Sequence, residues 1–233
     1  MNKFKGFVSV ILVVISLVFI VIWQLLFAEE VNVYITCIAV LVLSMLPAFV
    51  SFEKGNSNAR EITLIATLVS LAVISRAAFY LIPQVKPIGA VVIVSAVCLG
   101  AKRGHIIGAF SAFVSNFIFG QGYWTPFQMV ALGFVGFIAG LVFKYIDANR
   151  LNLAIVGFIL TFAVYGLIVD ISTIIGAYGN NITLQGVLSV YAAGIPFSFV
   201  FGLATAVFLF AFGEPFVKKI NRINVKYNLV NTD

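Results

Sequence analysis

Asn116-Phe117-Ile118-Phe119-Gly120-Gln121-Gly122-Tyr123-Trp124-Thr125-Pro126-Phe127-Gln128-Met129 forms a polar and aromatic interruption between two apolar runs. Gly120 and Gly122 permit turns that side chains would hinder. Thr125-Pro126 is a favourable helix start, with Thr as N-cap and Pro at the first helical position. The stretch therefore predicts two helices joined by a turn that displays amide and aromatic groups, as expected of a ligand-binding loop.

The composition is that of a polytopic membrane protein. Of the 233 residues, 62% are hydrophobic and 9% are charged, and the mean hydropathy is +1.14. Ordinary soluble domains have roughly 45–50% apolar and about 25% charged residues. The net charge of +6 is spread over short segments between apolar runs, so membrane topology explains it better than nucleic-acid binding. Cys37 and Cys98 lie in separate apolar runs, and neither a disulfide nor a metal site is expected.

Eight apolar segments predict an all-α protein with eight membrane spans. Residues 7–28 and 31–52 form an N-terminal transmembrane hairpin, assigned to a unit over 1–55. The polar stretch 53–61 separates it from a core over 56–233 with a basic tail. The segments of the core lie at about 62–82, 88–101, 104–119, 125–143, 151–177 and 187–213. The second of these is too short to cross about 30 Å of hydrocarbon upright, so it must extend or be shielded by its neighbours.

The basic residues orient the chain in the membrane. With the N-terminus in the cytoplasm, twelve of them fall inside: Lys3, Lys5, Lys54, Arg60, Lys102, Arg103, Lys144, Arg150, Lys218, Lys219, Arg222 and Lys226. Of the loops that then lie outside, only 83–87 carries a basic residue, Lys86. Positive residues favour the cytoplasmic side, so we expect a multi-pass bacterial plasma-membrane protein with both termini in the cytoplasm. Loops 83–87, 120–124 and 178–186 then face outward.

Small residues recur at helical spacing in two of the core spans. Gly104, Gly108, Ala112 and Asn116 follow one another every four residues, and Gly133, Gly136 and Gly140 do much the same in the next span. Such stripes let helices approach closely in lipid. Packing within the protein explains both stripes. A stripe of small residues on the first core span is also a candidate face for a membrane partner.

Two ionisable residues lie within spans, where an unpaired charge is costly. Counted from the cytoplasmic side at about 1.5 Å per residue, Arg76 and Asp170 reach a comparable depth in the outer part of the membrane. Three interpretations are open: an ion pair that joins two helices, the floor of an outward-facing ligand pocket, or an Arg76 side chain that reaches the interface by itself.

The outer loops carry the groups that would bind a ligand. Amides at Asn116, Gln121 and Gln128 accompany the rings of Tyr123 and Trp124, a surface that suits a bulky, partly apolar molecule with polar edges. The rings alone would also fit the aromatic belt of a membrane protein. The sequence contains no nucleophile–base pair and no spacing of metal ligands, so no catalytic residue, metal or enzyme activity is expected.

At this point the sequence resembles a known family. The phrases Leu81-Ile82-Pro83-Gln84-Val85-Lys86-Pro87 and Phe119-Gly120-Gln121-Gly122-Tyr123-Trp124-Thr125-Pro126-Phe127-Gln128-Met129 are similar to those of substrate-binding S components of energy-coupling factor (ECF) vitamin transporters. The resemblance covers about 56–216, is strongest over 76–143 and is greatest to the cobalamin-type S components. The N-terminal hairpin departs from the usual six-span pattern.

The resemblance implies a role in vitamin uptake. An S component binds a vitamin, here expected to be cobalamin, and delivers it with a transmembrane coupling subunit and two ATPase subunits. The chain has no phosphate-binding loop of its own, and no cofactor is expected. Docking would use Ala66 and Ser70 on the first core helix. The expected substrate-binding residues are Arg76, Tyr80, Gln84, Lys86, Asn116, Gln121, Tyr123, Trp124, Thr125, Gln128, Asp170, Tyr178 and Asn180.

Two other classes of function stay open from the residues alone. A membrane scaffold or assembly protein would use the small-residue stripes to bind other helices, and its aromatic residues would only mark the interface. An intramembrane enzyme would need Asp170 as an acid or base.

Overall fold

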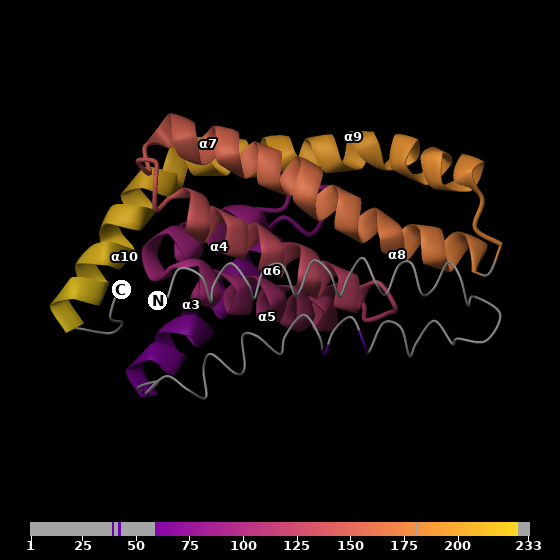
Figure 1. Ribbon diagram of the computed structural model, residues 1–233. Helices are drawn as coiled ribbons and strands as arrows, with labels where there is room; N and C mark the ends of the chain where they lie inside the picture. Colours follow the sequence, from indigo (N-terminus) through magenta and orange to yellow (C-terminus); the bar gives the residue numbers. More distant parts are fainter. Residues whose placement is uncertain (1–38, 40–41, 43–58, 180, 228–233) are drawn as a thin grey trace, which may run out of the picture.

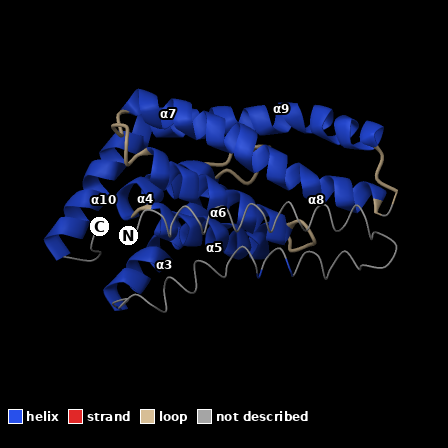
Figure 2. Ribbon diagram, in the orientation of Figure 1, coloured by secondary structure: helices blue, strands red, loops and turns tan. Residues whose placement is uncertain are grey.

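The computed structural model describes residues 39, 42, 59–179 and 181–227. The predicted hairpin over 1–55 and its boundary with the core lie outside the described residues, as do the ends of the chain. Within the described part every regular element is helical (Figure 2), which agrees with the expected all-α class.

Six helical segments form an elongated bundle (Figure 1). Four are single helices, and two are longer segments in which a π-helical turn (η) joins two α-helices. Their bounds are α3 Ala59–Ala78, α4 Ile88–Leu99, α5 Ala101–Phe119, α6 Thr125–Val142, α7 Arg150–Ile159 with η1 Leu160–Tyr165 and α8 Gly166–Tyr178, and α9 Leu184–Phe208 with η2 Leu209–Gly213 and α10 Glu214–Tyr227.

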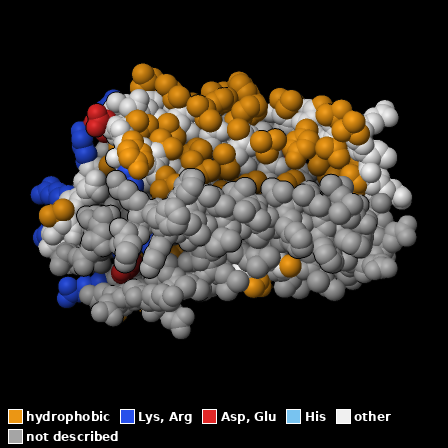
Figure 3. Space-filling model, viewed as in Figure 1, with side chains coloured by type: hydrophobic (Ala, Val, Ile, Leu, Met, Phe, Trp, Pro, Cys, Tyr) orange, Lys and Arg blue, Asp and Glu red, His pale blue; other side chains and the backbone are white. Residues whose placement is uncertain are grey.

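Four of these segments are long and apolar enough to cross a membrane. They are α3, α6, the segment 150–178 and the segment 184–227. Figure 3 shows apolar side chains spread over the face formed by α7, α8 and α9. Examples are Ile155, Leu167 and Leu203, each about half exposed. An apolar outer face of this kind is expected of helices that contact lipid.

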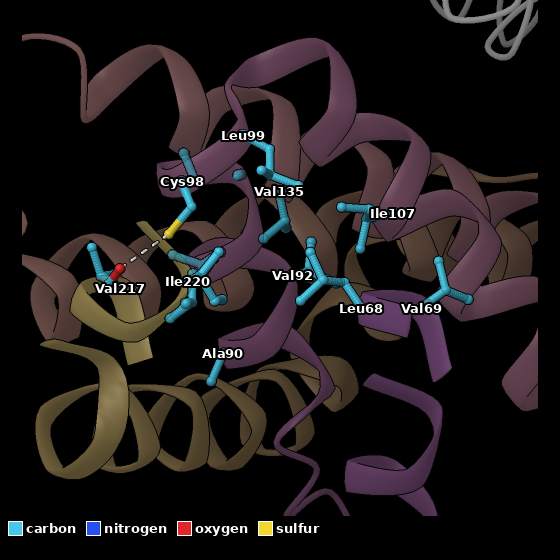
Figure 4. Packing of buried hydrophobic residues seen from close by; sticks show 14 of the residues in the cluster. Leu68, Val69, Ala90, Val92, Cys98, Leu99, Ile107, Val135, Val217 and Ile220 are labelled. Atoms are coloured by element: carbon cyan, nitrogen blue, oxygen red, sulfur yellow. Dashed lines mark hydrogen bonds between the residues drawn. The ribbon is translucent and has the colours of Figure 1, made fainter. Parts of the chain in front are cut away.

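The short helix α4 lies at the centre of the bundle. Its 12 residues rise roughly 18 Å, well below the 30 Å or so of a bilayer core. The segment does not extend into the preceding loop. Instead it is shielded, because all of its residues except Val91 and Val97 are buried. Side chains from α3, α5, α6 and α10 pack around it (Figure 4).

The glycine stripes bring α5 and α6 into close contact. A Cβ atom added to Gly108 would overlap the backbone carbonyl of Leu132, and one added to Gly136 would overlap that of Gly104. The His105 ring packs against Gly133 in the same interface, so His105 is buried rather than interfacial. Both stripes therefore serve helix packing within the chain.

The two ends of the bundle differ in charge. At one end, which we call the basic end, lie α10, the start of α5 with Lys102 and Arg103, and the α6–α7 connection with Lys144, which leads to Arg150 at the start of α7. Figure 3 shows basic side chains gathered at this end. The ion pairs of the described residues also lie there: Arg103 with Glu61 at 2.6 Å, and Glu214 with Lys218 at 2.6 Å and Arg150 at 3.5 Å. The opposite end, the loop end, carries the connection 120–124 and the connection from α8 to α9, while the connection 79–87 lies part-way along the bundle toward that end (Figure 2).

Candidate substrate-binding site

A network of polar side chains joins α3, α5 and α6 near the loop end. The guanidinium of Arg76 donates to the Ser115 hydroxyl and, at 2.9 Å, to Asn116 Oδ1. Asn116 Nδ2 donates to Gln128 Oε1 at 2.9 Å and to Thr125 Oγ1 at 3.0 Å. Five of the predicted site residues are thus connected, because Thr125 Oγ1 in turn donates to Gln121 Oε1 at 2.9 Å.

The turn between α5 and α6 sets this geometry. Asn116 lies in the last turn of α5, which ends at Gly120 with a φ of 99°, a value that favours glycine. Trp124 occupies the N-cap position of α6, so the helix begins one residue earlier than predicted, and Thr125 is its first residue rather than its cap. The Thr125 hydroxyl instead accepts from the amide of Gly122 at 3.2 Å, which fastens the turn to the helix.

Asn116 is the centre of the network rather than part of its surface. Only 1% of the residue is exposed, and its amide oxygen and nitrogen are both engaged by neighbouring side chains. It therefore positions Arg76 and Gln128, which are both partly exposed. Gln121 is exposed, and its amide nitrogen donates to the carbonyl of Phe113 at 3.0 Å.

The Phe119 ring brings two more predicted residues, Lys86 and Tyr80, next to Arg76. The Arg76 guanidinium carbon lies 4.2 Å from its centre and Lys86 Nζ lies 4.5 Å from it. The Tyr80 ring is 5.1 Å away, centre to centre. An aromatic face attracts cations, so the ring holds two positive groups close together. Loop 79–87 is thereby joined to the end of α5.

Loop 79–87 contains a backbone turn at Gln84 and positions the side chains of Gln84 and Lys86. Gln84 adopts a φ of 59°, and its side chain is partly exposed. Lys86 Nζ lies 3.5 Å from the carbonyl oxygens of Phe79 and Tyr80. Partial burial lowers the pKa of Lys86 below its ordinary value of 10.5, and the nearby charge of Arg76 lowers it further.

Tyr123 and Trp124 pack against one another and against glycines. Their ring centres are 5.2 Å apart in an edge-to-face arrangement. The Trp124 ring covers Gly122, while the Tyr123 ring lies across Gly176 of α8. Both rings are partly exposed. They therefore form an aromatic surface beside the network, and Tyr123 connects it to α8.

Asp170 and Tyr178 do not join this network through hydrogen bonds or ion pairs between described residues. The Asp170 carboxylate lies against Gly194 of α9, and the Tyr178 ring covers Gly186. The possible ion pair between Arg76 and Asp170 does not form within the described structure, because Arg76 is directed to Ser115, Asn116 and Phe119. Asn180, the remaining predicted loop residue, lies outside the described residues.

Three residues beside the predicted site were not identified from the sequence. Ser115 accepts from Arg76, and Phe119 holds the two cations. Tyr165, in η1, lies near both Arg76 and Asp170 and packs on Phe201 with ring centres 4.8 Å apart. Tyr165 could have been identified, because a tyrosine in the middle of an apolar span is a polar group that needs a partner. Neither Ser115 nor Phe119 differs in type from many neighbours.

The predicted docking residues lie on the outer face of α3. Ala66 and Ser70 are both exposed. The Ser70 hydroxyl donates to the Ala66 carbonyl at 2.9 Å in the same helix, so its polar hydrogen is satisfied and the position offers a small surface. Among the described residues no group of His, Cys, Asp and Glu could hold a metal ion.

Comparison with known proteins gives one match. The family of ECF-type riboflavin transporter S components matches residues 56–220, well over half of the 233 residues. The chain belongs to this family. The polar network, the Phe119 cluster and the docking stripe all lie inside the matched region. A search of curated proteins and of solved structures found no match.

The match agrees with the resemblance to ECF S components but does not support the cobalamin type. S components are substrate-specific parts of vitamin transporters, and they are not a family of enzymes. The prediction of cobalamin rested on the resemblance carried by the phrases 81–87 and 119–129. The amides and rings of these phrases do not by themselves distinguish one vitamin from another.

Proposed function

We propose that this S component binds riboflavin, or a closely related flavin, at the loop end of its helical bundle. The observation that carries the proposal is the connected set Arg76–Asn116–Gln128 beside the partly exposed rings of Phe119 and Trp124. The riboflavin description of the matching family supports this substrate class over cobalamin.

The chemistry of a flavin suits these groups. Its tricyclic ring is flat and aromatic, with carbonyl and N–H groups along one edge and a hydroxylated chain attached. Partly exposed rings supply a stacking surface, which stabilises such contacts by about 0.5–1.5 kcal/mol each. Arg76 and Lys86 donate hydrogen bonds but cannot accept them, so they suit carbonyl oxygens, while the Gln121 and Gln128 amides both donate and accept.

The proposal includes the orientation and the partners of the chain. The basic end faces the cytoplasm and the loop end faces outward, as the distribution of Lys and Arg favours. A transmembrane coupling subunit contacts α3 at Ala66 and Ser70, and two ATPase subunits supply the energy. The chain thus selects the vitamin, and the other subunits drive its release into the cytoplasm.

A direct binding experiment tests the substrate. The purified full chain is titrated into riboflavin in detergent, and quenching of flavin fluorescence reports stacking on protein rings. We expect saturable quenching and a rise in the unfolding temperature with riboflavin, because a ligand that binds only the folded state stabilises it. Cobalamin, added at equal concentration, should produce no comparable rise.

Two variants and a control locate the site. Trp124→Ala and Gln128→Ala should each weaken riboflavin binding about tenfold, which corresponds to about 1.4 kcal/mol. Tyr145→Ala is the control, because Tyr145 is 79% exposed at the basic end and its loss should leave affinity unchanged. A wild-type chain that neither quenches riboflavin nor gains stability from it would overturn the proposed substrate.

A further inference from the structure

The helix α10 has three distinct faces. Val217, Ile220 and Asn224 are buried against the end of the bundle. Cys98 of α4 lies beside this face, with its Sγ 3.7 Å from the Val217 carbonyl oxygen (Figure 4). Figure 1 shows that α10 turns away from the line of α9 and runs across the basic end of the molecule. The packed face therefore fixes how the other two faces point.

A basic stripe covers the side of α10 away from the bundle. Lys218, Arg222 and Lys226 follow one another every four residues, and such residues are neighbours on one side of a helix. Lys219 lies next to them. Lys218 is engaged by Glu214 at 2.6 Å. In the described part of the chain, Lys219, Arg222 and Lys226 make no ion pair with a carboxylate.

An exposed apolar stripe lies between the packed face and the basic stripe. Phe216, Ile223 and Tyr227 follow at intervals of seven and four residues and are 42%, 38% and 52% exposed. At the far end of the helix the two stripes meet, since Lys226 Nζ lies 5.1 Å from the centre of the Tyr227 ring. A face that only contacted water would gain nothing from this row of large apolar side chains.

We infer that α10 lies in the membrane interface and binds the headgroups of anionic phospholipids through Lys219, Arg222 and Lys226. Phe216, Ile223 and Tyr227 enter the boundary of the acyl chains, while the basic stripe reaches the phosphates above them. Apolar and basic stripes side by side are the arrangement of interfacial helices. This inference does not depend on which vitamin the protein binds.

Charge favours anionic lipid over a zwitterionic one as the occupant. Each basic residue near an anionic surface strengthens binding by about 1 kcal/mol, or about fivefold. Three cations without a carboxylate partner in the described structure would therefore discriminate strongly between the two kinds of headgroup. The apolar stripe keeps the helix at the depth where the phosphates lie.

Native mass spectrometry of the full chain tests the inference. Protein in detergent is mixed with phosphatidylglycerol or phosphatidylcholine, and the lipid retained on the folded protein is counted. We expect the wild type to retain phosphatidylglycerol at least tenfold more strongly than phosphatidylcholine. The triple variant K219Q/R222Q/K226Q should lose this preference, and high salt should weaken it in the wild type because salt screens exposed charges.

A second triple variant is the matched control. R60Q/K102Q/K144Q removes the same number of exposed positive charges from the same end of the molecule but leaves α10 intact, so the preference should persist. Equal retention of phosphatidylglycerol by the wild type and the α10 variant would overturn the inference, as would an equal loss in the control. The inference would also be overturned if an acidic protein co-purified with the wild type but not with K219Q/R222Q/K226Q, while both retained the same amount of phosphatidylglycerol.

Discussion

Asn116 shows how a single buried amide can organise several polar side chains around it. Its oxygen and nitrogen face Arg76 of α3 and Thr125 and Gln128 of α6. A buried polar group left without partners costs about 1–3 kcal/mol. If Asn116 were replaced, Arg76, Thr125 and Gln128 would each lose a hydrogen-bond partner. We therefore expect its replacement to weaken flavin binding indirectly but strongly.

Replacement of Asn116 tests this role. Asn116→Leu keeps the approximate volume and removes every hydrogen bond of the side chain. We expect the free energy of unfolding to fall by about 1–3 kcal/mol and flavin affinity to fall at least tenfold, measured by thermal unfolding and fluorescence titration.

Ser111→Ala is the control for Asn116→Leu. Ser111 is fully buried in the same helix, and its hydroxyl has no hydrogen-bond partner among the described residues. Removing it should not destabilise the protein, because no hydrogen bond between described residues is lost and a buried polar group without a partner is itself costly. If Asn116→Leu behaved like Ser111→Ala, the network would not organise the site.

Lys86 should give the protein a pH dependence in the alkaline range. Its pKa is lower in the folded protein than its ordinary value of 10.5, first through burial and then through Arg76. Between the lowered pKa and 10.5 the unfolded chain binds more protons than the folded one, so stability contributed by this group rises with pH.

The comparison with Lys86→Gln isolates that contribution. Unfolding temperatures are measured from pH 8 upward for both proteins, and the wild type should gain more stability with pH than the variant. If the unfolding temperatures of the two proteins changed equally with pH, the lowered pKa of Lys86 would be contradicted. Lys86→Arg should keep the positive charge throughout this range, because arginine titrates above about pH 12.

At the residue scale, the sequence predicted which groups gather but not every contact between them. Arg76, Asn116, Gln121, Thr125 and Gln128 were identified from polarity within apolar surroundings, and the structure joins them. The ion pair of Arg76 with Asp170, one of three interpretations left open by the sequence, does not form between the described residues. Equal depth in a membrane does not determine which side of a helix a residue occupies.

The close packing of α5 and α6 depends on glycines, which have no side chain at the contact between the two helices. Gly108 and Gly136 lie where the backbone of one helix contacts the backbone of the other. This contact holds Asn116 of α5 beside Thr125 and Gln128 of α6. The small-residue spacing in the sequence predicted the contact correctly, because few other arrangements use four-residue repeats of glycine in lipid.

A methyl group at Gly108 should separate the two helices. It would overlap the carbonyl of Leu132, which cannot move without its helix. We expect Gly108→Ala to destabilise the protein by about 1–3 kcal/mol and to weaken flavin binding, measured by thermal unfolding and titration.

Gly213→Ala is the matched control within η2. A Cβ there would meet only side-chain atoms of Leu153 and Leu209, the nearest at 3.1 Å. These side chains can adjust, so stability should change little. Equal losses in both variants would show that the backbone contact at Gly108 has no special importance.

The two π-helical turns were not predictable from the sequence. Each inserts a wide turn into a long apolar segment. Because most neighbouring side chains there are apolar on all sides, one additional residue leaves no visible break in the hydrophobic pattern. The end of the last apolar segment at 213 was predicted and coincides with the end of η2, but the continuation of the helix as α10 was not predicted.

At the scale of the whole molecule, the outer face of α3 is the surface on which we propose that the coupling subunit docks. Ala66→Leu and Ser70→Leu place large side chains on that exposed face, far along the helix from Arg76. We expect co-purification of a coupling subunit and ATPases to be lost, while riboflavin still binds with unchanged affinity.

Ala193→Leu is the control for the docking face. Ala193 is exposed on α9, so the substitution adds the same bulk to a different side of the bundle. Loss of the partners in all three variants would indicate a general defect in the protein and would count against docking through α3.

The central position and short length of α4 also affect the loop end. From Gly100, α4 rises roughly 18 Å and α5 roughly 28 Å, so the connection before α4 lies part-way along the bundle rather than at its tip (Figure 2). A vitamin bound against Arg76 and Lys86, as proposed, would lie between this inner connection and the α5–α6 turn that carries Trp124. Differences in affinity among variants should then arise chiefly from residence time and not from the rate of capture.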